Sequence, residues 1–558
     1  MNIYELYFKD YINKNIASIF FYIIITCSVL LLENIFGPIY YSKIITLLNI
    51  SNFSKSFNKS FHEIFYILCG IWFIIFILYL FKHYTEEKIL PLYVSTLRNN
   101  LINLTFEKYK NNVKDIKIGD HIMRIMRVSV ELSDGMHEFT SILFPSIIGL
   151  LIICLYLFKI NINIALFLLF GFLLYTIIII VYSIKIINIS SNRENFYFKN
   201  IDKLNSKFTN LINIYLNNQK NKEIDDSTND QNIYQELLKN QMNNTNNLII
   251  YLQVLSILLF LISIYISFYY YKNNKLSKYN FILMLIILTY FLNLSLKFSL
   301  VFPMFIIRIG VAKNSLNYFN NLSNINNSNN SKNIIINNGT LIIKNLSFYY
   351  ETNNTKKYIF NNMNIEFKSG ERVAILGNSG SGKSTLAKLI MNLYNYEGNI
   401  YLDNNDIKNI DYNILRKNII YINQKTELFD NTIYENIKYG NNINEDDILN
   451  IINKYNLNNI YSGLKENYNS NCGVNGNKLS LGMQKITILL RAYFKVKDSK
   501  IIIFDEPLAG LDKDTRKKIL KLINDIDKTK TIIIITHDVE ILSIVDKQID
   551  INDIKLNS

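Results

Sequence analysis

Six long apolar runs precede residue 310, and they constrain the fold more than any other feature of the sequence. Each contains about 17 to 24 uncharged residues, enough for a helix to cross roughly 30 Å of hydrocarbon. Buried helices of a soluble protein are the alternative, but six runs of this length favour a membrane bundle. We therefore expect an all-α domain of six transmembrane helices. The runs are approximately Ile16–Phe36, Ile64–Phe81, Phe139–Phe158, Ile164–Ile187, Leu248–Tyr271 and Tyr279–Phe302.

Composition agrees with a membrane protein that has more than one domain. The chain has 558 residues, too many for one compact core. Hydrophobic residues make up 49% and charged residues only 19% of the chain, whereas soluble proteins average about 25% charged residues. This balance excludes an extended disordered chain. The four cysteines form no CxxC pair, which argues against a disulfide framework or a zinc site.

The net charge of +14 has two interpretations. One is an acidic partner such as a nucleic acid, and the other is the excess of Lys and Arg on cytoplasmic membrane loops. The basic residues are scattered rather than clustered, so we favour the second and expect no nucleic-acid partner. They are abundant in the long segments after the second and fourth apolar runs, which places these segments and both termini in the cytosol. Few Gly or Pro residues interrupt these segments, which indicates helices that continue out of the membrane and return.

The composition changes near Asn320, where an Asn-rich stretch predicts a linker over residues 319–338. The linker separates a transmembrane domain over 1–318 from a second domain over 339–558. That second domain alternates short β-type runs with polar helical segments, as an α/β fold does. Its strand candidates are LIIKNLSFYY, RVAILG, NIYL, IIYIN, KIIIFDE and TIIIITHD.

A glycine-rich loop follows the strand predicted at Arg372–Leu376 and precedes a predicted helix. It satisfies GxxxxGK[ST], the pattern of a P-loop NTPase, in which backbone N–H groups and a helix N-terminus hold phosphate oxygens. Lys383 would place its charge on the β- and γ-phosphates, and the Ser384 hydroxyl would bind Mg²⁺. The loop consists of Gly377, Asn378, Ser379, Gly380, Ser381, Gly382, Lys383, Ser384 and Thr385.

Two later strands end in groups that suit phosphate chemistry. Ile501–Phe504 runs into Asp505, which would hold Mg²⁺, and Glu506, which would polarise the attacking water. Ile532–Ile535 is followed closely by His537, whose imidazole could reach the γ-phosphate from the same edge of the sheet. A lone His is usually structural, but its place after a buried strand favours a catalytic role here.

Together these residues resemble the nucleotide-binding domain of an ATP-binding cassette (ABC) transporter over 339–545. The resemblance implies ATP and Mg²⁺ as ligands, with Tyr350 stacked on adenine. It places Gln424 in the Q-loop, among the Mg²⁺ ligands and the groups that stabilise charge during hydrolysis. His537 fits the switch histidine, and Asp512 fits the D-loop aspartate.

The signature motif departs from the family pattern. The family has LSGGQ, whereas this chain has LSLGM, with Leu481 in place of the first glycine and Met483 in place of Gln. In the family, the signature of one chain completes the phosphate site of a second chain, which gives Ser480 and Gly482 that role here. Val474 stands where the family usually has Glu, and QKITILLRA lacks the usual QR pair. We expect slower or altered turnover but an active site, because the catalytic residues are retained.

The membrane half resembles the exporter class of the same family. The stretch KIGDHIMRIMRVSVELSDGMHEFTSILFPSIIG looks like the family's passage from the first intracellular loop into the third membrane helix. One transverse coupling helix would lie near Tyr109–Gly119, and the second within about 210–225. Glu33, Lys297 and Arg308 lie near helix ends and are candidates for the transport pathway. For Lys297 and Arg308 we favour snorkelling or exposure on the cytosolic side.

The resemblance implies a half-transporter that exports an unidentified substrate, driven by ATP binding and hydrolysis. It would be an integral, multi-pass protein in contact with membrane lipid, with its cassette in the cytosol. One cassette lacks the surface that completes its phosphate site, so the chain is expected to form a homodimer or a heterodimer with another half-transporter. The alternative, which LSLGM motivates, is a catalytically impaired regulatory partner in a heterodimeric transporter.

Overall fold

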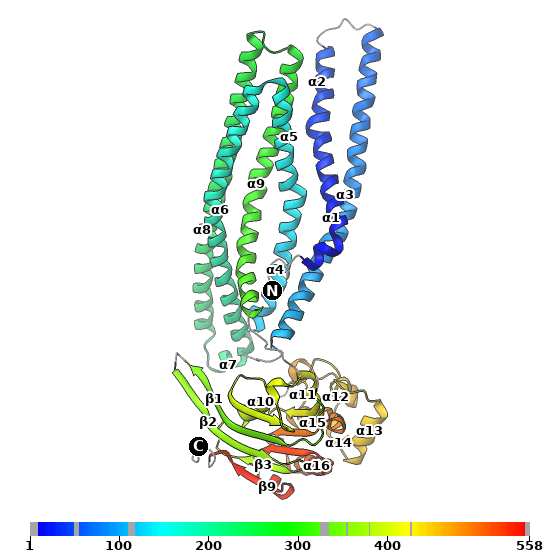
Figure 1. The fold of residues 1–558 in the computed structure, drawn as a ribbon, viewed down its shortest axis with the longest axis vertical. Helices are drawn as coiled ribbons and strands as arrows, with labels where there is room; N and C mark the ends of the chain where they lie inside the picture. Colours follow the sequence, from blue (N-terminus) through cyan, green and yellow to red (C-terminus); the bar gives the residue numbers. More distant parts are fainter. Residues whose placement is uncertain are drawn as a thin grey trace. The chain divides into compact units, whose positions relative to one another are not determined.

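The computed structural model describes residues 9–48, 55–109, 118–323, 334–352, 355–378, 380–424 and 427–552. Contacts within the chain divide it into two compact units, with the division near residue 326. The first unit consists of long helices, and the second combines two β-sheets with short helices (Figure 1). The expected fold class, a six-helix membrane domain followed by an α/β domain, is confirmed.

The described residues of the membrane unit contain six spans that are long and apolar enough to cross a membrane. Two of them contain a π-helical turn, η2 (Leu32–Phe36) between α1 (Asp10–Leu31) and α2 (Gly37–Leu48), and η3 (Phe139–Leu143) between α4 (Ile118–Glu138) and α5 (Phe144–Ile160). α9 continues into the segment expected as linker. The other spans are α3 (Lys55–Tyr109), α6 (Ile162–Thr209), α8 (Lys220–Lys272) and α9 (Lys278–Ser323).

The membrane helices are longer than a bilayer is thick. α6 has 48 residues and α8 has 53, which corresponds to roughly 70–80 Å of helix against roughly 30 Å of hydrocarbon. Ion pairs join the polar halves of α6 and α8, with Lys203 Nζ 2.7 Å from Asp230 and Lys207 Nζ 3.0 Å from Glu223. The expected helical extensions beyond the apolar spans are therefore present.

A short helix, α7 (Leu211–Leu216), lies at the turn between α6 and α8. It falls within the range predicted for the second coupling helix. Its apolar side chains are exposed in this chain, with Ile212 and Leu216 at 75% and 77%. Most of the segment Tyr109–Gly119, predicted as the first coupling helix, lies outside the described residues.

The second unit is built on a parallel sheet with strand order β6-β7-β8-β3-β9. A smaller antiparallel sheet has the order β2-β1-β4-β5. The parallel strands are β3 (Arg372–Leu376), β6 (Ile419–Ile422), β7 (Ile501–Asp505), β8 (Thr531–Ile535) and β9 (Lys547–Asp550). The antiparallel strands are β1 (Leu341–Thr352), β2 (Thr355–Phe367), β4 (Glu397–Leu402) and β5 (Asn405–Asp406).

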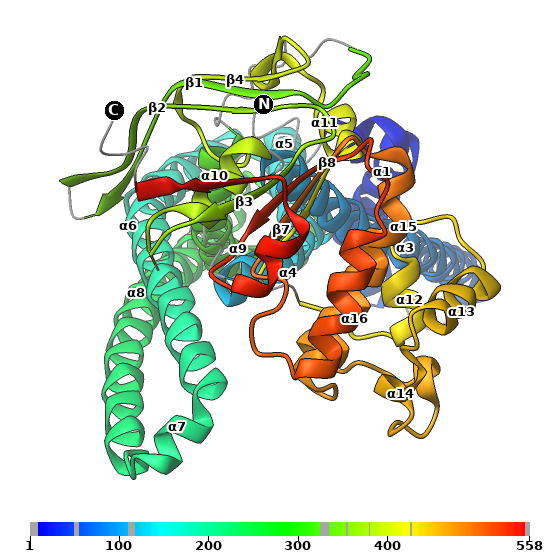
Figure 2. The same cartoon turned by 90° about the horizontal axis from the view of Figure 1, so that it is seen from below.

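Helices cover both faces of the parallel sheet. The α-helices of this unit are α10 (Lys383–Ile390), α11 (Tyr412–Asn418), α12 (Ile433–Lys438), α13 (Glu445–Lys454), α14 (Asn458–Tyr461), α15 (Leu481–Lys495) and α16 (Lys513–Asn524). The antiparallel sheet and α10 pack on one face, and α12, α13, α15 and α16 pack on the other (Figure 2). In β7, Ile501 and Ile503 face the first layer while Ile502 and Phe504 face the second. A strand covered on both faces needs such a continuous apolar run.

The segment before β1 is fastened by one carboxylate. Asp403 lies between β4 and β5 with φ +47°, in the left-handed region. Its two oxygens accept four backbone N–H bonds of 2.7–2.9 Å. The donors are Asn337, Asn338, Gly339 and Thr340. Residues 337–340 are thereby tied to the turn between these strands.

Candidate nucleotide-binding site

The carboxyl ends of three parallel strands lie level with one another, because Ile375 of β3 and Asp505 of β7 both pair with Ile535 of β8. Ligands of open α/β sheets bind at this edge. The loops leaving the three strands line one pocket, which gathers all but four of the predicted nucleotide-binding, catalytic and metal residues. Of those four, Ser379 lies outside the described residues, and Ser480, Gly482 and Asp512 are not part of the pocket lining.

Backbone geometry accounts for the glycines of the phosphate loop. Gly382 has φ +99° immediately before α10, and a Cβ there would lie 2.5 Å from Ile359 Cγ2 and 2.9 Å from Phe360 Cζ. The helix begins at Lys383, whose Nζ donates hydrogen bonds to the carbonyl oxygens of Gly377 (2.7 Å) and Asn378 (3.0 Å). The unpaired N–H groups of a helix start and this ammonium together favour an anion.

Tyr350 of β1 stands beside the loop. Its ring packs edge-on against Phe348 and Tyr394, with centroids 4.9 Å and 6.2 Å away. Its hydroxyl lies 3.3 Å from Thr385 Oγ1. The side chain remains 37% exposed, so part of the ring is available to stack on a planar base.

Asp505 is buried at the end of β7 and is held by a residue that sequence reasoning missed. Tyr421 of the neighbouring strand β6 donates a hydrogen bond of 3.0 Å to Asp505 Oδ2. Burial, and then the Asp505 carboxylate, raise the pKa of Tyr421 well above its usual value, so the phenol stays protonated as a donor. The only sequence signal for Tyr421 is its place in a strand that precedes Gln424.

Glu506 and His537 form a pair at the mouth of the pocket. Glu506 has φ +50°, and its Oε1 lies 2.8 Å from His537 Nδ1. Because a carboxylate only accepts, Nδ1 carries the hydrogen of this bond. The Glu506 side chain is 9% exposed and that of His537 is 70% exposed. The structure therefore brings together the two residues predicted as base and switch histidine.

Two carboxylate oxygens of the pocket are suited to binding a hard cation. Within the described part of the chain, Asp505 Oδ1 and Glu506 Oε2 are buried and lack a hydrogen-bond partner. Buried acceptors of this kind cost free energy unless a cation or water meets them. The carboxylate of Asp505 and the hydroxyl of Ser384, which lines the same pocket, are the donors that Mg²⁺ prefers. Gln424 is exposed at the end of β6 and also lines this pocket.

The ABC transporter family model matches residues 360–509, which include the phosphate loop and the β7 carboxylates. ABC transporter ATM1 of Plasmodium falciparum is 42% identical over 186 residues, which cover 33% of this chain and 17% of that protein. The ATP-dependent lipid A-core flippase of Francisella tularensis is 31% identical over 188 residues (33% and 30%). MdlB of Buchnera aphidicola, a multidrug resistance-like ATP-binding protein, is 36% identical over 176 residues (31% and 30%). The match thus spans less than a third of each relative.

A solved structure extends the likeness to the membrane unit. A bacterial Atm1-family ABC exporter with ATP bound superposes with a TM-score of 0.86 at 18% identity, covering 97% of this chain and 93% of that one. The chain therefore contains the ATPase domain of the ABC transporter family. It has the exporter fold, with six membrane helices preceding one ATPase domain, and it is an integral, multi-pass membrane protein with a cytosolic ATPase unit.

The signature region of this chain is formed as a helix start. Ser480 Oγ accepts the Met483 N–H at 3.3 Å and caps α15, and Asp512 caps α16 by accepting the N–H groups of Asp514 and Thr515. Leu481, which replaces the family glycine, is 51% exposed. Leu481 is thus exposed at the start of α15.

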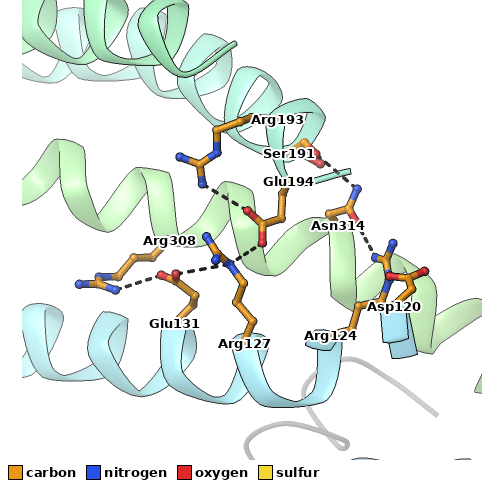
Figure 3. A network of polar contacts seen from close by, with 9 residues as sticks. All are labelled: Asp120, Arg124, Arg127, Glu131, Ser191, Arg193, Glu194, Arg308 and Asn314. Atoms are coloured by element: carbon orange, nitrogen blue, oxygen red, sulfur yellow. Dashed lines mark hydrogen bonds and ion pairs between the residues drawn. The ribbon is translucent and has the colours of Figure 1, made fainter. Parts of the chain in front are cut away.

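Charged side chains of the membrane unit form a network across α4, α6 and α9 (Figure 3). Glu194 of α6 is fully buried between Arg127 (2.5 Å) and Arg193 (3.2 Å). Arg127 also lies 4.0 Å from Glu131, which continues the network to Arg308 of α9 at 2.9 Å. A second branch runs from Asp120 through Arg124 to Asn314, whose amide donates to the Ser191 carbonyl.

That Arg308 snorkels or is exposed on the cytosolic side stays a prediction, and the structure adds acidic partners that the sequence did not predict. Its guanidinium lies 2.9–3.0 Å from Glu131, Asp134 and Glu138, and its side chain is 27% exposed. The three carboxylates lie on α4 at spacings of three and four residues, which places them on one helical face. That spacing was the sequence signal for a cationic partner. Lys297 is exposed in this chain.

Glu33 lies in the π-helical turn η2. Its Oε1 accepts a hydrogen bond of 3.0 Å from the Tyr79 hydroxyl of α3. Of the three charged candidates for the transport pathway, Glu33 therefore has one neutral partner and Arg308 has three acidic ones. This contrast explains why Arg308 is better suited to joining helices than to meeting a cargo.

Proposed function

We propose that this ABC transporter is an ATP-driven exporter in which hydrolysis in two ATPase units moves a cargo through two six-helix units. The observation that carries the proposal is the Glu506–His537 pair beside Lys383 in one pocket. Supporting it, the same chain contains six spans that can cross a membrane. The cargo is not assigned.

Each group of the pocket has a role in hydrolysis. The backbone N–H groups of the loop and Lys383 bind the phosphates of ATP, and Tyr350 stacks on the base. Glu506 polarises the attacking water through Oε2, while its Oε1 is held by His537 Nδ1. His537 and Gln424 stabilise the charge that develops on the γ-phosphate. Mg²⁺, held by Ser384 and Asp505, would neutralise phosphate charge when bound.

The positions of the signature residues support a dimer. Ser480 and Gly482 are at the start of α15 and do not line the pocket of their own chain. Free N–H groups at such a helix start favour the phosphates of a nucleotide bound to a second chain. A partner chain would therefore complete each site, and both nucleotides would be shared.

The regulatory-partner alternative is less well supported. LSLGM motivated it, but Lys383, Glu506 and His537 are all present and converge on one pocket. An impaired partner would be expected to lack one of them. We therefore propose a chain that hydrolyses ATP by itself as a homodimer.

The test is steady-state ATPase activity of the purified full chain in lipid nanodiscs. Wild type should hydrolyse ATP without another half-transporter, and Glu506→Gln should lower kcat by at least about 100-fold, the scale for losing a catalytic base. Glu445→Gln, an exposed site at the start of α13, is the matched control and should leave kcat unchanged. Equal activities of wild type and Glu506→Gln would contradict the mechanism, and an inactive wild type would favour the regulatory alternative.

A further inference from the structure

The turn that carries Glu506 is strained and weakly bonded. Glu506 has φ +50° and Gly510 has φ +72°, both in the left-handed region, which costs free energy for a residue with a Cβ. Two hydrogen bonds within the turn are long, from Ala509 N to the Glu506 carbonyl (3.4 Å) and from Leu511 N to the Leu508 carbonyl (3.3 Å). Pro507 supplies no N–H. The geometry of Glu506 therefore depends on contacts from outside the turn.

Two cations from neighbouring helices supply such contacts. Lys485 of α15 donates from Nζ to the carbonyl oxygen of Glu506 (3.2 Å) and to that of Ala509. Arg516 of α16 donates from Nε to the Leu511 carbonyl at 3.1 Å. Bonds from charged donors are stronger than neutral ones, so the turn is held at both ends.

Lys485 reaches Glu506 from outside the nucleotide pocket. It lines a neighbouring cavity together with Glu427 and Gln484, whereas the described lining of the nucleotide pocket does not include it. Glu506 and Gln424 line both cavities. Lys485 can therefore affect Glu506 without contacting the nucleotide.

The same face of α15 makes a second contact with the turn. Leu481 lies one helical turn before Lys485, and its Cδ2 is 2.8 Å from the position that a Cβ on Gly510 would take. Leu481 is the residue that departs from LSGGQ, and Lys485 lies where the usual QR pair is missing. Both residues that depart from the family pattern thus contact the turn that carries Glu506.

We infer that Lys485 is a positioning residue that holds Glu506 in its catalytic conformation, with Leu481 packed beside it on the same turn. The inference rests on the proposed function, because it assigns Lys485 a part in ATP hydrolysis at that site. It also links the two sites of a dimer. Helix α15 presents Ser480 to the nucleotide of the partner chain, and Lys485 of the same helix holds the Glu506 that acts on the nucleotide of its own chain.

The test compares Lys485→Met, Lys485→Arg and Glu506→Gln in the nanodisc ATPase assay. Lys485→Met should lower kcat about 10-fold, within the range for disturbing a general base, while KM for ATP stays within about twofold because the nucleotide pocket is intact. Lys485→Arg keeps the charge and should restore at least about a third of wild-type kcat. Lys497→Met replaces an exposed lysine just beyond α15 and should leave kcat and KM unchanged.

The outcomes separate this inference from the proposed function. A wild-type kcat in Lys485→Met beside an inactive Glu506→Gln would overturn the positioning role and leave the exporter proposal standing. A loss of kcat matched by an equal loss of ATP binding, or no recovery in Lys485→Arg, would mean a general structural role and would also overturn it. Equal kcat in wild type and Glu506→Gln would overturn both. If Lys485→Met does not fold, Lys485→Gln replaces it with the same expectations.

Discussion

Each of the two units contains charged side chains that are held in a different way. In the membrane unit, Glu194 is paired with Arg127 and Arg193, side chain to side chain. In the ATPase unit, Lys485 donates to main-chain carbonyls, and Asp403 accepts from main-chain N–H groups. Glu194 is therefore held by opposite charges, whereas Lys485 and Asp403 are held by backbone groups.

The difference follows from what each fold does with its backbone. A long helix uses nearly all of its N–H and C=O groups internally, so a buried charge must find a partner among side chains. Strand ends and turns leave backbone groups unpaired, and these can hold a charge directly. Removing Glu194 should therefore leave two cationic side chains unpaired, whereas removing Asp403 or Lys485 should leave only neutral backbone groups unpaired.

The largest effect is expected from Glu194→Gln. It leaves two arginines without their buried anion, which typically costs about 3–5 kcal/mol. Trp72 of α3 is the only tryptophan in the sequence, so its fluorescence reports unfolding of the membrane unit alone. The unfolding midpoint monitored by Trp72 should fall clearly in the variant.

Two further variants sharpen that result. Glu87→Gln, an exposed position on α3, should leave the midpoint nearly unchanged. The triple replacement Arg127→Met, Arg193→Met and Glu194→Leu should recover much of the loss, because it removes all three charges together. A Glu194→Gln midpoint equal to that of Glu87→Gln would show that the network does not stabilise the unit.

An intermediate effect is expected from Asp403→Ala. The variant loses four accepted N–H bonds, and we expect local opening to become easier by about 1–3 kcal/mol. Amide hydrogen exchange of residues 334–345 should accelerate by roughly 5- to 150-fold, the rate equivalent of that free energy. Asp403→Asn retains one carbonyl oxygen and tolerates the left-handed φ, so its exchange rate should lie between those of wild type and Asp403→Ala. The exposed Asp446→Ala is the control, and an equal rate in it and in Asp403→Ala would contradict the prediction.

The smallest effect is expected from Lys530→Met. Lys530 Nζ donates to the carbonyls of Ser499 (2.6 Å) and Lys497 (3.2 Å), and burial, followed by the charge of Lys500, lowers its pKa. Between this lowered pKa and the ordinary value of 10.5, the unfolded chain binds more protons, so the wild-type free energy of unfolding rises with pH. Calorimetry of the full chain should show this rise in wild type and a smaller one in the variant. At pH 7 the unfolding midpoints of wild type and Lys530→Met should agree within about 2 °C. A much lower midpoint in the variant would contradict the expected difference between the two units.

The sequence predicted the elements with the strongest patterns. All six spans and the six strand candidates are present, because apolar runs bounded by charge or by turn residues leave few alternatives. β2, β5 and β9 were not predicted. β1 and β2 pair with three register shifts, which interrupt the alternation that marks a strand. β5 has only two residues, and β9 has a single apolar residue, Ile549, among its four.

The candidate site was predictable where a motif fixes both residue type and spacing. The phosphate loop, Asp505, Glu506 and His537 converge as expected, because the ends of parallel strands share one edge. Tyr421 and Lys485 were missed because each acts on a neighbour brought close only by the fold. The acidic partners of Arg308 were missed because its position near a helix end was weighed without the acidic face of α4.

The four amide bonds to Asp403 decide where the ATPase unit can be cut from the chain. A fragment that begins at Leu341, the first residue of β1, lacks all four donors and leaves a bare carboxylate at the sheet edge. One that begins at residue 339 keeps two donors, and one that begins at 334 keeps all four together with the buried side chain of Ile336. An autonomously folding fragment should therefore start several residues before the first strand.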